Sequence, residues 1–298
     1  MKKSKKNDSV RASNRHRSPM GEIWHRLRKN KGAIIGAVFL LILTFFAVFA
    51  DVLFDYDTQV VAINAKERLM HPCKEHWLGT DHLGRDVLIR LLYGAKYSLP
   101  IGLVAVVLGL TVGLALGAIA GYFGGKVDNI IMRLLDILGS IPSFLLAMIL
   151  IVSFNSKGML PMMVALGVGS ITGFARTTRT SVMMHRNQEY VESALAIGEN
   201  HTSVIFRHVV PNSLSRVIVS ASLRMGSAII SASSLSYLGL GILPPAPEWG
   251  AMLSDGRSYV RDYSYLTIFP GLFIVFTVIS FNMIGDGLRD AMDPKLKH

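Results

Sequence analysis

The sequence has a single cysteine, Cys73, and few charged residues. One cysteine excludes an internal disulfide, so the chain is not a small extracellular scaffold held by such bonds. Charged residues make up 17% of the 298 residues, whereas soluble domains carry about 25%. Hydrophobic residues make up 51%, and the charges cluster between long apolar runs. This distribution is typical of a protein that crosses a membrane several times.

Acidic residues are scarce at the N-terminus, where basic residues are abundant. Residues 1–31 contain eleven lysines and arginines against Asp8 and Glu22, and an apolar run follows directly. The positive-inside rule places this basic arm in the cytoplasm. Attraction to anionic lipid accounts for most of its charge, so we do not expect nucleic-acid binding. The first run, 32–54, is too long for the core of a signal peptide and is predicted to be a retained anchor.

Six apolar runs have the length needed to cross a membrane. Each has about 20 residues, which spans a hydrocarbon core of about 30 Å at a helical rise of about 1.5 Å per residue. The sequence therefore predicts an all-α, multi-pass membrane protein with both termini in the cytoplasm. The runs are 32–54, 98–121, 130–153, 159–180, 217–238 and 264–285. The outer loops would be 55–97 and 239–263, the inner loops 122–129 and 181–216, and the cytoplasmic tail 286–298.

Glycine and proline residues in two runs predict features of helix packing. The second run contains four glycines spaced four residues apart, Gly109, Gly113, Gly117 and Gly121. Because this spacing puts them on one helix face, it favours a close seam with another helix, within the protein or in a partner. Pro142 lies inside the third run and predicts a kink, because proline removes one backbone hydrogen bond.

Few charged residues lie inside the apolar runs. Arg224 is the most unusual, and charges in such positions usually face a cavity or a partner. It is therefore a candidate to line a pathway and meet a substrate carboxylate; the alternative is that its long side chain reaches back to the membrane interface. Arg133 and Asp136 are three residues apart, which favours an ion pair on the helix surface. Asp136 is kept as a second pathway candidate.

No group of residues predicts an active site, a metal site or a bound cofactor. A phosphate-binding loop at GYFGGKV (121–127) would need glycine at 120 and serine or threonine at 127, but the chain has Ala120 and Val127. The outer loop holds possible metal ligands, His71, Cys73, His76 and His82. Their spacing matches no standard zinc pattern, so an ordinary surface loop is preferred. We expect this chain neither to bind ATP nor to act as an enzyme.

The polar segment between the fourth and fifth runs carries the most specific motif. Glu192-Ser-Ala-Leu-Ala-Ile-Gly198, with Pro211 thirteen residues later, resembles the cytoplasmic E-A-A-x-x-x-G signature of ABC importer permeases. Ser193, His208 and Val210 depart from the usual Ala, Ile and Leu. Other segments resemble the C-type subunit of dipeptide and oligopeptide permeases. They are WHRLRKNKGAIIG (24–36), HWLGTDHLGRD (76–86), AGYFGGKVDNIIMRLLDIL (120–138), LGLGILPPAPEWGAMLSDGR (238–257) and FNMIGDGLRDAMDPKL (281–296).

The resemblance implies the type I ABC importer permease fold, with a core domain at 98–285. In such permeases the segment that corresponds to 186–212 forms a coupling helix that docks on an ATP-binding subunit. The candidate coupling residues are Glu192, Ala194, Leu195, Gly198 and Pro211. Gly198 is expected to end one helix in a left-handed turn. ATP and Mg²⁺ would be bound by the partner subunits.

The resemblance also implies partners and a location. The expected partners are a second, non-identical permease, two ATP-binding subunits and an extracytoplasmic solute-binding protein, in the inner or plasma membrane of a bacterium. Segments 76–97 and 239–263 are candidate contacts for the binding protein. The residues proposed for this contact are Trp77, Asp81, Arg85, Glu248 and Trp249. The two tryptophans could equally be anchors at the membrane interface.

The implied substrate is a short peptide, and two sets of alternatives stay open. Within the family, the substrate could instead be nickel, a metal chelate or glutathione. Many relatives carry glutamate two turns after Arg224, where this chain has Ala232, a departure expected to alter the pathway lining. Outside the family, the chain could be a channel or secondary carrier, although no internal repeat is obvious. A membrane enzyme would need a nucleophile or metal cluster, and neither is found.

Overall fold

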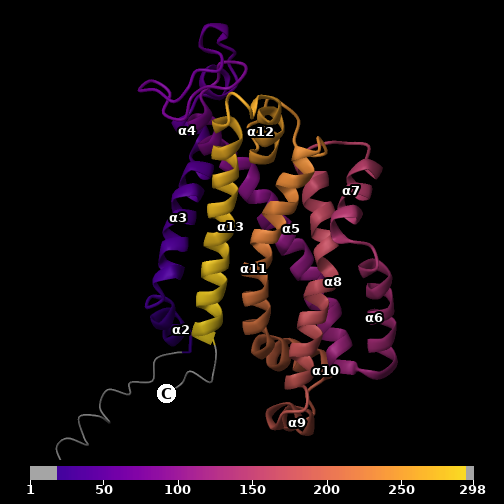
Figure 1. The fold of residues 1–298 in the computed structure, drawn as a ribbon. Coiled ribbons are helices and arrows are strands. Elements are labelled where there is room, and N and C mark those ends of the chain that lie inside the picture. The colour runs from indigo at the N-terminus through magenta and orange to yellow at the C-terminus, as the bar shows by residue number, and fades with distance from the viewer. Residues whose placement is uncertain (1–18, 293–298) are drawn as a thin grey trace, which may run out of the picture.

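The computed structural model describes residues 19–292, and within this range the chain is helical, with one isolated β-bridge between Thr80 and Asp86 (Figure 1). Five helical runs are long and apolar enough to cross a membrane. They are α3 (Lys31–Val48), α5 (Val87–Phe123), α8 (Met159–His185), α10 to α11 (His201–Tyr237) and α13 (Tyr265–Met292). The predicted all-α membrane fold is confirmed.

The third predicted span is a broken helix rather than a kinked one. Helices α6 (Gly125–Gly139) and α7 (Ser143–Ser153) meet at an angle of 79° and together count as a sixth candidate span. Pro142 caps the N-terminus of α7 in an extended conformation instead of lying inside a helix. A proline also disfavours helical geometry at the residue before it, here Ile141, so the chain leaves the helix at this point.

Helix α5 begins eleven residues before the predicted start at 98, inside the predicted outer loop. The Asp86 side chain accepts a hydrogen bond from the backbone N–H of Ile89 and caps this end. The first turns contain Arg90 and Lys96, whose charges lower the local hydropathy, so the prediction from hydropathy placed the start of the helix too late. Both are paired: Arg90 donates to the Val60 carbonyl at 2.9 Å, and Lys96 contacts Asp51 at 2.6 Å.

The four spaced glycines form a close seam between α5 and α8. All four are buried, and α8 passes so near that a side chain would not fit. A Cβ atom on Gly117 would lie 2.4 Å from the carbonyl oxygen of Ala175. One on Gly109 would lie 2.9 Å from the Gly167 carbonyl oxygen. The predicted seam is therefore present, and it lies within this chain.

The helices line up across the molecule, with α3 and α13 side by side at one edge and α6 and α7 at the other (Figure 1). The loops that follow α4 (Ala50–Leu53) and helix α12 (Trp249–Gly256) lie at one end of the bundle. At the opposite end lie α2 (Pro19–Leu27), α9 (Glu189–Ala196) and α10 (His201–Val204). Following the sequence prediction, we call these the outer and inner ends.

Candidate functional site

The segment 186–212 projects from the inner end of the bundle (Figure 1). Helix α9 ends at Ala196, the chain turns at Gly198, and α10 leads through a π-helical turn, Ile205–Val209, into α11 (Val210–Tyr237). Gly198 has φ +90°, with nothing within 4 Å of the place a Cβ would occupy. Backbone conformation, rather than lack of space, therefore explains glycine here. The left-handed turn predicted for Gly198 is present.

The inner segment has one face packed against the bundle and one face exposed. Val191 and Ala194 are buried in a cluster that also contains Ala118 of α5 and Val182 of α8. Ala194 was predicted as a coupling residue, but its side chain packs beneath its own helices and is not available at the surface. Among the other predicted coupling residues, Glu192 and Pro211 are exposed.

Besides Tyr190, which is 38% exposed, three large side chains without polar atoms are exposed in this segment. Ile197 is 84% exposed, Phe206 is 69% exposed and Leu195 is 37% exposed. Of these, only Leu195 was predicted as a coupling residue. The signature motif gave no signal for Phe206, because it lies outside the E-A-A-x-x-x-G pattern. A projecting apolar surface beyond the end of the bundle is typical of a protein–protein contact.

A polar network fixes the turn between α9 and α11. The Glu199 carboxylate accepts a hydrogen bond from the Ser203 hydroxyl and lies 2.8 Å from His208 Nε2. The Ser203 hydrogen bond, followed by that of His208, lowers the pKa of the Glu199 carboxyl. His208 replaces the Ile of the family signature, and the structure gives it this carboxylate as partner. The Tyr122 hydroxyl also meets His201 Nδ1 at 2.8 Å and ties the turn to α5.

Arg224 lies midway along α11 and points into the bundle. Its guanidinium carbon is 5.0 Å from the centre of the Phe174 ring on α8, and its Nε donates to the Ser220 hydroxyl at 3.3 Å. It lines an open pocket between α5, α7, α8 and α11. The other lining residues are Ala105, Val106, Ser143, Phe144, Leu166, Gly169, Ser170, Ser227, Ala228 and Ser231. The side chain therefore packs on a neighbouring helix and borders this pocket, and its role in a pathway stays a prediction.

The second pathway candidate, Asp136, is placed differently. Its carboxylate pairs with Arg176 of α8 at 2.7 Å, and both side chains are more than half exposed. The predicted helix-surface pair with Arg133 is therefore wrong, because Arg176 on the facing helix binds the carboxylate instead. Asp136 is also not among the residues that line the pocket beside Arg224.

Asp128 and Ala232 are two further residues of this region that the structure places. Asp128 of α6 pairs with Arg179 of α8 through two hydrogen bonds of 2.5 Å, an interaction the sequence did not indicate. Ala232, where a departure from the family was expected to alter the pathway, is buried in a cluster with Ile101 and does not line the pocket. The alanine at this position therefore affects the packing between helices and not the lining of the pocket.

At the outer end, four of the five predicted binding-protein contacts are buried. Trp77 is 73% exposed. Asp81 instead accepts a hydrogen bond from Arg85 Nε at 2.7 Å, and the indole N–H of Trp249 donates to the Leu91 carbonyl at 2.9 Å. Glu248 accepts the first backbone N–H groups of α12, and burial raises the pKa of its carboxyl. The expectation that these four side chains face a partner is wrong, because each is satisfied inside the outer end.

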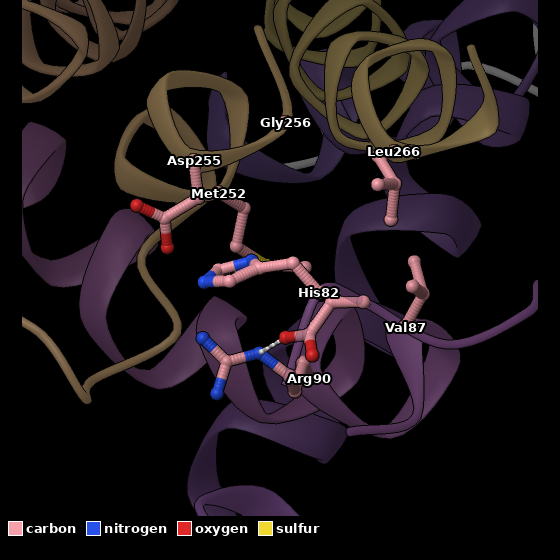
Figure 2. Close-up of a pocket in the computed structure, with 8 residues that line it drawn as sticks. His82, Val87, Arg90, Met252, Asp255, Gly256 and Leu266 are labelled. Carbon is pink, nitrogen blue, oxygen red and sulfur yellow. Dashed lines mark ion pairs between the residues drawn. The ribbon is translucent and has the colours of Figure 1, made fainter. Parts of the chain in front are cut away.

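A small pocket lies among these outer residues (Figure 2). Figure 2 shows the Arg90 guanidinium in an ion pair, which it makes with Asp81 at 3.5 Å, while His82 and Asp255 line the same pocket. The His82 ring also stacks on Tyr259, with ring centres 5.6 Å apart. In residues 19–292, no group of three His, Cys, Asp or Glu side chains could hold a metal ion.

Comparison with known proteins gives matches along nearly the whole chain. The family model "Binding-protein-dependent transport system inner membrane component" matches residues 113–298, and "N-terminal TM domain of oligopeptide transport permease C" matches residues 18–72. The glutathione transport system permease protein GsiD of Pectobacterium atrosepticum is 43% identical, over 94% of this chain and 93% of that protein. The dipeptide transport system permease protein DppC of Alkalihalophilus pseudofirmus is 42% identical, over 94% and 91%.

The fold is also similar to solved permease structures. The inward-facing MetNI methionine ABC transporter matches with a TM-score of 0.57 and 18% identity, over 68% of this chain and 97% of that chain. An amino acid ABC transporter with histidines matches with a TM-score of 0.51 and 13% identity, over 67% and 94%. At these identities the likeness concerns the fold alone.

Proposed function

The chain belongs to the family of binding-protein-dependent transport system inner membrane components, and from this we infer that it is the membrane-spanning permease subunit of an ABC importer of short peptides. The single observation that carries this inference is the family match over residues 113–298. Permease subunits of this kind are not enzymes, and ATP is hydrolysed by their partner subunits. The protein is a multi-pass component of the bacterial inner membrane.

Coupling to ATP hydrolysis takes place at the inner segment 186–212. Leu195, Ile197 and Phe206 are apolar and exposed, and they dock in a groove of the ATP-binding subunit. Val191 and Ala194 on the opposite face join α9 to the bundle. A movement of the docked subunit is thereby carried through a packed core into the spans. ATP and Mg²⁺ stay on the partner, in keeping with Ala120 and Val127 at the positions where a phosphate loop needs other residues.

Substrate crosses between this chain and a second, non-identical permease. The pocket beside Arg224, between α5, α7, α8 and α11, offers half of a pathway. A solute-binding protein delivers peptide to the outer end, where Trp77 is exposed. The N- and C-termini lie in the cytoplasm, in accordance with the basic residues of the N-terminal arm.

Peptide is the preferred substrate because the relatives named for dipeptide and for glutathione transport are both similar to this chain over nearly its full length. Both named substrates are small peptides with free carboxylates. Nickel or a metal chelate is the less favoured alternative within the family.

The docking proposal predicts that a charge at position 197 weakens assembly. Ile197→Asp should reduce the amount of ATP-binding subunit that co-purifies with this chain in mild detergent, because an aspartate in an apolar groove loses its hydration. Ile63→Asp is the matched control: it is the same substitution at an isoleucine that is 68% exposed at the outer end, and it should leave recovery unchanged. Equal recovery of the ATP-binding subunit with Ile197→Asp would contradict the docking role.

A further inference from the structure

Arg224 lies inside the helical bundle without a carboxylate partner, unlike Arg176 and Arg179 on the neighbouring helix α8. Arg176 and Arg179 on α8 pair with Asp136 and Asp128 on α6, at 2.7 and 2.5 Å. Within residues 19–292, no carboxylate lies within ion-pair distance of Arg224. A charge inside a span is costly unless an opposite charge or a wet cavity meets it. The structure thus leaves a positive charge in the bundle that a negative group from outside the chain can neutralise.

The neighbouring helix is shaped to hold this guanidinium in place. A Cβ atom on Gly173 of α8 would lie 2.3 Å from Nη2 of Arg224 and 2.6 Å from Cζ. A larger residue at this position would displace the guanidinium from its present place. The next residue, Phe174, presents its ring to the guanidinium, an arrangement that attracts a cation and limits its motion. The Arg224 Nε also donates to the Ser220 hydroxyl, one turn toward the inner end of α11, and the side chain borders the pocket.

The pocket beside Arg224 combines hydroxyl groups with an apolar wall. The serines that line it are Ser143, Ser170, Ser227 and Ser231, of which Ser170 donates its hydroxyl proton to the Gly167 carbonyl at 2.8 Å. Arg224, Ser227 and Ser231 are three and four residues apart, which places them on one face of α11. The apolar wall includes Val106, Phe144 and Leu166, and no acidic residue lines the pocket. Hydroxyls donate to and accept from carboxylate and amide groups, and apolar walls tolerate varied side chains.

We propose that this pocket is a binding site for the free carboxylate of a peptide in transit, with Arg224 as the group that pairs with it. This binding site rests on the proposed import function and adds to it a selectivity for peptides that carry a free carboxylate. The guanidinium binds the carboxylate with two parallel hydrogen bonds, and the serine hydroxyls contact the adjoining peptide groups. Gly173 is a positioning residue, because it contributes space and no contact to the substrate. The permease thereby selects for a free carboxylate, independently of the solute-binding protein.

The test uses the complete transporter in proteoliposomes, supplied with saturating binding protein and labelled Ala-Ala or its C-terminal amide. Arg224→Gln should lower the initial rate of Ala-Ala uptake by about tenfold or more, the usual effect of losing a charge-assisted pair, and leave the rate for the amide unchanged. Arg224→Lys should restore part of the Ala-Ala rate. Gly173→Ala keeps the charge of Arg224 but displaces its guanidinium, and it should also lower the rate of Ala-Ala uptake.

Two controls separate a substrate contact from a structural role. Arg216→Gln removes a charge from the inner, exposed part of the same helix and should leave both uptake rates unchanged. Basal ATP hydrolysis should be equal in all complexes, which shows that they assemble. Each variant is compared with the unmodified complex for the same peptide, so the preference of the binding protein cancels.

The outcomes distinguish the two levels of the proposal. Unchanged Ala-Ala uptake with Arg224→Gln, or an equal fall for Ala-Ala and its amide, would overturn the carboxylate site while leaving the importer intact. Absence of ATP-dependent uptake in the unmodified complex would instead contradict the proposed function.

Discussion

Gly117 of α5 allows a direct test of the close packing on which the bundle depends. A Cβ atom on Gly117 would lie 2.4 Å from the carbonyl oxygen of Ala175 and 2.7 Å from the Cβ of Thr178. Both are well inside the roughly 3.5 Å at which carbon atoms pack favourably. Gly117→Ala therefore forces α5 and α8 apart by about 1 Å at this point.

The magnitude follows from two opposing effects. Replacing glycine by alanine inside a helix gains about 0.5–1 kcal/mol, while overpacking a tight core costs about 1–3 kcal/mol and occasionally more. The two ranges subtract to a net loss of up to about 2.5 kcal/mol of unfolding free energy, with a central value between about 1 and 2 kcal/mol. For a chain of this size that lowers the unfolding temperature by roughly 2–8 °C.

Gly271 of α13 provides the matched control, because nothing lies within 4 Å of the place where its Cβ would be. Gly271→Ala is the same substitution in another apolar helix and should be neutral or stabilising. The assay is thermal unfolding of the purified protein in detergent, followed by helical circular dichroism. An unfolding temperature for Gly117→Ala equal to or above that of Gly271→Ala would refute the close seam.

Two predictions concern polar contacts. A double-mutant cycle with Asp128→Asn and Arg179→Gln should give a coupling of about 1–3 kcal/mol in the unfolding free energy, because both hydrogen bonds of the pair are charge-assisted; additive effects would contradict the pairing. The lowered pKa of Glu199 means that its bonds to Ser203 and His208 stabilise the inner segment at neutral pH. This contribution is present above the ordinary carboxyl pKa and is lost as the pH falls through the lowered value. Limited proteolysis of 186–212 should accelerate in acid, and Glu199→Gln should make the rate equally fast at neutral pH; a variant as resistant as the unmodified protein would contradict this role.

The sequence was sufficient for features that depend on composition and spacing. Apolar runs of spanning length have few alternatives to helices in lipid, because every backbone polar group must be satisfied within the segment. Glycines four residues apart necessarily share a helix face, so the spacing of the glycines between Gly109 and Gly121 was enough to predict the seam. The left-handed turn at Gly198 followed from the chemistry of glycine at a helix end.

Features that depend on where the chain turns were harder to predict. A straight and a sharply bent span have the same hydropathy, so the 79° break between α6 and α7 was not apparent from composition. The local signal for the break was Pro142, because proline is well tolerated at the start of a helix and so could mark the beginning of a second helix. The early start of α5 was missed because Arg90 and Lys96 lower the local hydropathy, whereas in the fold both charges are paired.

Asp81, Arg85, Glu248 and Trp249 were predicted to contact the binding protein because they lie in segments that the resemblance assigns to the outer loops. Their burial depends partly on partners that are distant in the sequence: the Ser98 hydroxyl donates to Glu248 at 3.4 Å, and the indole N–H of Trp249 donates to the Leu91 carbonyl at 2.9 Å. A sequence does not reveal such pairings one residue at a time. The lack of a carboxylate partner for Arg224 became meaningful for the same reason, once Arg176 and Arg179 were seen to have theirs.

ATP-dependent peptide uptake is the measurement that tests the proposed function most directly. The chain would be reconstituted in liposomes with its partner permease, ATP-binding subunits and binding protein, and labelled Ala-Ala uptake measured with ATP or a non-hydrolysable analogue. We expect labelled Ala-Ala to accumulate in the liposomes only when both ATP and the complete set of subunits are present. Equal uptake by this chain in liposomes without ATP or partners would contradict an importer and support a self-contained carrier.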